Sequence, residues 1–118
     1  MITLKKIEIE KVLIQIIAFD PKTQKPSAGL LTESTTLGMK RRLQKIHTVL
    51  MDKYKEYGED IKKIEDECGE DMDKRKTEID MLNEEYVSID CQPIDSKQLD
   101  SIVTDTNYNF DILEKICE

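Results

Sequence analysis

Residues 39–86 read MKRRLQKIHTVLMDKYKEYGEDIKKIEDECGEDMDKRKTEIDMLNEEY, and this stretch decides the fold. Apolar side chains recur along it at a mean step of about 3.6 residues, the period of a straight α-helix. The row comprises Met39, Leu43, Ile46, Leu50, Tyr54, Tyr57, Ile61, Ile64, Cys68, Met72, Arg75, Ile79, Leu82 and Tyr86. Only Arg75 breaks its apolar character. The pattern predicts helix whose apolar face is covered by another part of the chain or by a partner.

Gly69 is the expected turn within this stretch. A glycine there can close one helix, and Asp71 can cap the next. The acidic residues around Gly69 suit the start of a second helix better than the end of a first. We therefore expect two antiparallel helices, about residues 39–67 and 72–87. The unbroken spacing leaves one alternative, a continuous helix about 75 Å long.

Short elements are expected before this hairpin. Residues 2–9 alternate in a strand pattern, with one slip at Lys5-Lys6. Residues 12–17 have the spacing of a short amphipathic helix, although their β-branched content leaves a strand as the alternative. Residues 20–29 contain two prolines and a glycine and are typical of an exposed loop. Residues 32–36 are rich in side chains that cap helices.

The C-terminal part predicts a second strand and short helices. Residues 86–91 alternate again, and residues 2–9 are their natural partner in a sheet. Ser96 is expected to cap a brief helix that carries Leu99, Ile102 and Val103. A loop at 104–109 and a final helix at 110–117 follow.

These patterns predict a mainly α fold of the α+β class, with a long antiparallel helical hairpin, a small two-stranded β-sheet and short flanking helices. The 118 residues fit a single domain. We divide residues 1–118 into a strand, short helix and loop at 1–31, the hairpin at 32–87, and a strand with short C-terminal helices at 88–118.

The charge and apolar content limit the classes of partner. With 25 acidic and 18 basic residues, the net charge is −7. We expect no direct binding to nucleic acid or to a membrane, because phosphate binding needs clustered cations. The longest apolar run, 12–19, is interrupted by Gln15 and is much shorter than the roughly 20 residues that span a bilayer.

The start of the chain and the cysteines indicate the expected compartment. The first residues do not have the pattern of a signal peptide. The three cysteines are an odd number, and we expect them to be reduced thiols in a cytoplasmic protein.

No sequence motif indicates catalysis. The chain has no Gly-rich phosphate loop, no HExxH and no paired-cysteine site. His47 is the only histidine, and an ordinary place beside the apolar row is expected for it. Six of the nine residues 65–73 are acidic, but they do not match a calcium-binding loop. We expect no enzymatic activity, no cofactor and no metal.

A basic group lies one turn into the first long helix. It comprises Lys40, Arg41, Arg42 and Lys45. Cations at this position oppose the helix dipole, which hints at pairing with an acidic partner or a phosphate. The alternatives are ion pairs within the chain or simple solvation. The candidate partner-binding residues are this basic group together with Leu50, Tyr54, Tyr57, Ile61 and Ile64.

The order of segments carries a resemblance. Ile2-Thr3-Leu4-Lys5-Lys6-Ile7 is followed by an apolar helix ending at Phe19, then by Gly38-Met39-Lys40-Arg41-Arg42-Leu43 and later by Tyr86-Val87-Ser88-Ile89-Asp90. This order, over residues 1–92, resembles small uncharacterised proteins encoded among the tail and virion assembly genes of tailed bacteriophages. The resemblance implies a phage origin, a role in virion assembly and a place in the host cytoplasm or the virion. It implies no functional residues.

The expected function is therefore non-enzymatic. We expect an interaction or assembly protein that acts through the apolar face of the hairpin and forms a homo-oligomer or a larger assembly. The alternative is an acidic inhibitor, or decoy, that blocks a basic nucleic-acid-binding surface of another protein through residues 59–73. Steep salt dependence of binding would distinguish this alternative.

Overall fold

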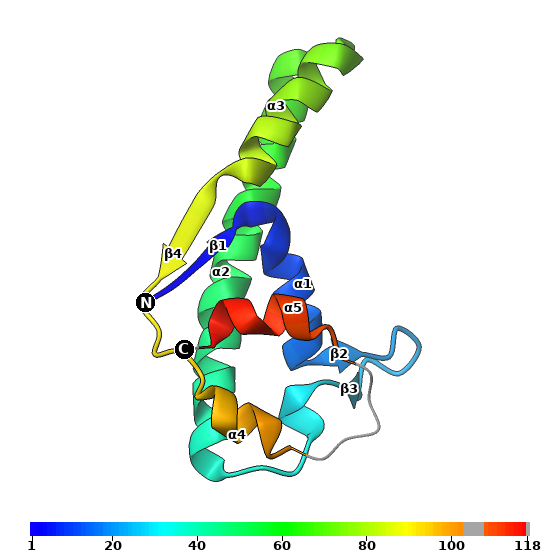
Figure 1. The fold of residues 1–118 in the computed structure, drawn as a ribbon. Coiled ribbons are helices and arrows are strands. Elements are labelled where there is room, and N and C mark those ends of the chain that lie inside the picture. The colour runs from blue at the N-terminus through cyan, green and yellow to red at the C-terminus, as the bar shows by residue number, and fades with distance from the viewer. Residues whose placement is uncertain (103–107, 118) are drawn as a thin grey trace.

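The computed structural model describes residues 1–102 and 108–117. Its main feature is the predicted hairpin, made of α2 (Leu37–Cys68) and α3 (Met72–Glu84) (Figure 1). The hydroxyl of Thr36 accepts a hydrogen bond from the Met39 N–H and caps the start of α2. The predicted mainly α fold of the α+β class is confirmed.

The turn lies at Gly69, as predicted. Its φ of +57° is a backbone conformation that favours glycine. The carboxylate of Asp71 accepts the Lys74 N–H at 3.1 Å and caps α3. The alternative of one continuous helix about 75 Å long is therefore wrong, and the molecule measures 49 × 35 × 21 Å along its principal axes.

The two predicted strands pair with each other. β1 (Ile2–Lys5) lies antiparallel to β4 (Tyr86–Ile89), with Ile2 opposite Ile89. The strand predicted over 2–9 is shorter because the Glu8 carboxylate accepts the Lys5 N–H at 2.8 Å. The chain then turns into a short 3₁₀ helix, η1 (Lys6–Glu8), which leads into α1 (Ile9–Ile16).

The segment predicted as a loop contains a small β-hairpin instead. β2 (Ala18–Phe19) and β3 (Pro26–Ala28) pair antiparallel. The turn between them is closed by backbone hydrogen bonds, from Asp20 N–H to the Lys25 carbonyl and from Gln24 N–H to the Asp20 carbonyl. The prediction missed this hairpin because two- and three-residue strands leave little alternation to detect. A 3₁₀ turn, η2 (Leu30–Thr32), follows.

The C-terminal elements are shorter than predicted. Asp95, not Ser96, caps α4 (Ser96–Asp100), because its carboxylate accepts the Lys97 N–H at 2.9 Å. Ile102 follows the end of that helix, and Val103 and most of the predicted loop lie outside the described residues. The predicted last helix is split into α5 (Phe110–Leu113) and a 3₁₀ turn, η3 (Glu114–Ile116).

The core forms around the first half of α2. One face of α1, the sheet and α5 all contribute to it. Its most deeply buried members are Leu4, Ile9, Val12, Ile16, Leu30, Met39, Leu43, Ile46, Leu50, Ile94, Leu113 and Ile116. We call this part the body. Burial of such side chains is worth roughly 1.5–3 kcal/mol each, so the body holds the fold together.

The remaining part of the hairpin projects from the body, and we call residues 61–82 the arm (Figure 1). Ile61 and Ile64 are only partly buried there, and Met72 is exposed. Arg75, the exception in the apolar row, donates a hydrogen bond to the Gly69 carbonyl at 2.6 Å and so holds the turn. The apolar row is thus core in the body, whereas in the arm it is buried at Cys68 and Leu82 and only partly covered at Ile61 and Ile64.

Candidate functional site

The structure separates the predicted partner-binding residues into different places. Leu50 is fully buried in the body and is not available to a partner. Tyr54 and Tyr57 are partly buried where the body meets the arm, with their rings in an edge-to-face contact at 6.5 Å. The basic group lies near the start of α2, at the other end of the molecule from the arm tip (Figure 1). The chain therefore does not present one continuous partner surface along the hairpin.

An apolar hollow lies between α1, β2 and the middle of α2. It has a volume of about 290 Å³ and is lined chiefly by Leu13, Ile14, Ile17, Phe19, Met51 and Tyr54. Ile14, Phe19 and Met51 keep about half of their surface exposed, at 52%, 52% and 49%. Large apolar side chains that gather around one concave surface are typical of a binding site for a protein.

Sequence reasoning missed the α1 side of this hollow. α1 buries Ile9, Val12, Leu13 and Ile16 in the body, which accounts for one face of the helix. Ile14 lies on another face and remains exposed. The sequence did contain a sign of this surface. The eight residues of α1 include more apolar side chains than one helix face can bury, and another large apolar residue, Phe19, follows the helix.

His47 lines the same hollow as these apolar side chains. Burial lowers the pKa of His47 below its usual value of 6.5. The imidazole is therefore neutral at neutral pH, which suits an apolar surface. The sequence predicted an ordinary place for His47 beside the apolar row and did not indicate that it lines a hollow.

A second, shallower groove lies on the arm. It has a volume of about 280 Å³ and is lined by Ile64, Met81 and Leu82, with Glu78 and Glu85 at its sides. Close by, Tyr57 donates a hydrogen bond to the Asn83 side-chain carbonyl and joins α2 to α3. Fewer apolar side chains line this groove than line the hollow, and two carboxylates border it.

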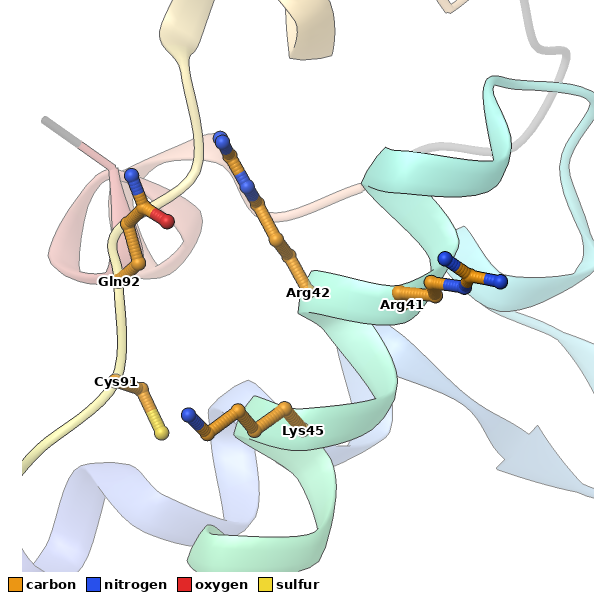
Figure 2. Close-up of a pocket in the computed structure, with 5 residues that line it drawn as sticks. All are labelled: Arg41, Arg42, Lys45, Cys91 and Gln92. Carbon is orange, nitrogen blue, oxygen red and sulfur yellow. The ribbon is translucent and has the colours of Figure 1, made fainter.

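The basic group borders a cavity of about 190 Å³, lined by Arg41, Arg42, Lys45, Cys91 and Gln92 (Figure 2). Lys45 extends from α2 toward Cys91, and Arg42 extends along the same side of the helix, whereas the guanidinium of Arg41 points the other way. Lys40, the fourth predicted member of the group, does not line the cavity.

The three thiols are free. Burial raises the pKa of the Cys68 thiol, and so does the Glu78 carboxylate that accepts its hydrogen bond. Burial also raises the pKa of Cys117. Cys91 is buried beside the basic cavity. Raised pKa values keep Cys68 and Cys117 as poorly reactive neutral thiols at neutral pH.

The acidic residues of the turn gather at the tip of the arm. The members of this acidic tip are Glu65, Asp66, Glu67, Glu70, Asp71 and Asp73, all exposed. Within residues 1–102 and 108–117, no three metal-ligating side chains come together in a metal site.

Comparisons of the chain with models of known families, with curated proteins and with solved structures found no match. No helix among the described residues has both the length and the apolar character needed to cross a membrane.

Proposed function

We propose that this protein is a non-enzymatic assembly protein that self-associates through the apolar hollow between α1, β2 and α2. The observation that carries this proposal is the half-exposed state of Ile14, Phe19 and Met51 around one concave surface. In water this surface is unfavourable, and a second copy that covers it gains the free energy of apolar burial.

The hollow is a better candidate than the arm groove for two physical reasons. It includes two aromatic side chains, Phe19 and Tyr54, and aromatic residues dominate the binding energy of protein interfaces. Among the described residues, Glu10 is the one acidic side chain that lines the hollow. Glu78 and the Lys6–Glu85 ion pair border the arm groove, and a partner that covered this groove would have to desolvate them.

The setting that we propose is the assembly of a bacteriophage tail or virion. The resemblance in segment order over residues 1–92 is the support for it. The hollow suits such a role because an assembly protein needs a surface that its own chain leaves uncovered.

Light scattering coupled to size-exclusion chromatography tests the proposal through matched variants. We expect the unmodified chain to elute above its monomer mass of 13.7 kDa. Met51→Asp places a charge in the hollow and should return the protein to monomer mass, with association weakened about tenfold or more. Met72→Asp is the control, because Met72 is 64% exposed at the start of α3 and lies outside the hollow.

Three results would contradict this proposal. A chain that is monomeric up to millimolar concentration does not self-associate in the way proposed. Equal effects of Met51→Asp and Met72→Asp would mean that the hollow is not the interface. An effect of Met81→Asp alone would move the interface to the arm groove.

The second candidate function is an acidic inhibitor or decoy of a basic protein surface. The observation that favours it is the acidic tip, where all six carboxylates are exposed at the far end of the arm. Binding of this kind would weaken steeply with salt, because exposed charges are screened. Assembly through the hollow predicts little salt dependence, so a salt series in the same light-scattering experiment separates the two functions.

A further inference from the structure

We propose that the cavity beside the start of α2 is a binding site for a phosphate group, held by Arg42, Lys45 and Gln92. Three cations, Arg41, Arg42 and Lys45, line this cavity, and no acidic side chain among the described residues lines it. The proposal is independent of assembly through the hollow.

The first argument is uncompensated charge. Some cations of the chain have carboxylate partners: Lys5 pairs with Glu84 and Lys6 with Glu85, each at 2.8 Å. Among the described residues, no carboxylate lies within 4.0 Å of the cationic atoms of Arg42 or Lys45. The predicted alternative of ion pairs within the chain therefore does not apply to these two residues as far as residues 1–102 and 108–117 are concerned.

The second argument is the position on the helix. Arg42 and Lys45 are the sixth and ninth residues of α2, one turn apart and beyond its first turn, so the two cations lie near each other toward the N-terminal end of the helix. Two cations there raise the local potential further in a chain whose net charge is −7. A bound anion offsets the repulsion between these two cations.

The third argument is the direction and kind of the donors. Figure 2 shows α2 on one wall of the cavity, with Arg42 and Lys45, and the segment after β4 on the other, with Gln92. Arginine offers two parallel N–H donors, lysine a mobile ammonium and glutamine an amide. Donors from two walls suit the terminal oxygens of a tetrahedral phosphate better than one planar carboxylate.

The fourth argument is size. The volume of about 190 Å³ is below the range of about 300–1,000 Å³ that holds a drug-sized ligand. The cavity can therefore take a small oxyanion or the phosphate group of a larger small molecule, but not a nucleotide base or a peptide segment as well. Free phosphate and a small phosphomonoester share this chemistry.

The test is a ¹H–¹⁵N NMR titration of the full-length protein with inorganic phosphate and, separately, with glycerol 2-phosphate. Sodium chloride at equal ionic strength is the blank. We expect saturable shifts at the amides of Cys91 and Gln92 and at those of residues 41–45. Tighter binding of the ester would identify a phosphorylated small molecule as the source, and tighter binding of inorganic phosphate would identify the free ion.

Variants make the result specific. Arg42→Gln and Lys45→Gln should each weaken phosphate binding about tenfold, because each removes a charge-assisted hydrogen bond. Lys40→Gln has the same change in net charge but lies outside the cavity, so it should change the affinity less than twofold. Because Arg42 and Lys45 repel each other and lie on the surface, both variants should fold, as the unshifted amides in their spectra will show.

The proposal is overturned if phosphate shifts no amide beyond the chloride blank. It is also overturned if Lys40→Gln weakens binding as much as Arg42→Gln, which would mean that phosphate senses only the overall charge of the helix end.

Discussion

At the residue scale, the turn between the long helices depends on one glycine. Gly69 has a φ of +57°, and Gly58 lies within α2 where an added methyl group would meet nothing within 4 Å. Gly69→Ala should therefore lower the free energy of unfolding by about 1–3 kcal/mol, through backbone strain. Gly58→Ala should raise it by about 0.5–1 kcal/mol, because alanine is the better helix former. Urea unfolding of the two variants measures both changes, and a Gly69→Ala protein as stable as Gly58→Ala would contradict the turn.

The same scale shows which details the sequence could predict. The caps at Thr36 and Asp71 and the turn at Gly69 were predictable, because each depends on local hydrogen bonding and local backbone conformation. The role of Arg75 was not, since its partner is a carbonyl group six residues away across the turn. Asp95 displaced Ser96 as the cap of α4 because a carboxylate one residue earlier reached the same helix end.

His47 gives the fold a pH dependence of known sign. Burial lowers the pKa of His47 in the folded protein, so the unfolded chain binds a proton more readily. The free energy of unfolding should therefore fall as the pH drops through 6.5 and below. At higher pH the ring is neutral in both the folded and the unfolded chain, and His47 adds no pH dependence. His47→Gln removes this pH dependence, so wild type should lose stability relative to the variant between about pH 7.5 and about pH 5.5. Urea unfolding at the two pH values measures the difference, and a difference that stays constant would contradict the partly buried position of the ring.

At the element scale, α2 is one helix with two different environments. Leu50 is fully buried in the body, whereas Ile61 is only partly buried in the arm. Leu50→Ala should lower the free energy of unfolding by about 2–5 kcal/mol, because it leaves a cavity in a packed core. Ile61→Ala should lower it by roughly 1 kcal/mol, since part of that side chain is already in water.

Chemical denaturation followed by circular dichroism checks this pair. Equal losses at the two positions would mean that the arm is packed as tightly as the body. The regular period of the apolar row could not predict the difference, because periodicity reports which face is apolar and not what covers it.

The β2–β3 hairpin shows that sequence patterns also have a limit in predicting short strands. Its sequence, with prolines and polar residues, is typical of a loop, and the pairing involves few residues. The β1–β4 pair was predictable because each strand alternates over four residues or more and because only two such segments exist. Phe19 reaches the hollow only through the short hairpin, so the hollow could not be found without it.

At the scale of the whole molecule, three surfaces of different chemistry are separated in space. The apolar hollow lies on the body, the basic cavity lies near the start of α2, and the acidic tip lies at the end of the arm. The sequence showed the basic and acidic groups directly, because the members of each lie close together along the chain. It did not show the hollow, whose lining residues come from three elements between residues 10 and 54.

The most direct test of assembly through the hollow is an isotope-filtered NOE experiment on a mixture of ¹³C-methyl-labelled and unlabelled copies. Only contacts between copies give a signal in this measurement. The account predicts intermolecular NOEs to the methyl groups of Ile14, Ile17 and Met51, and none to Met72 or Met81. Intermolecular NOEs confined to Met72 and Met81, with none at the hollow, would contradict it.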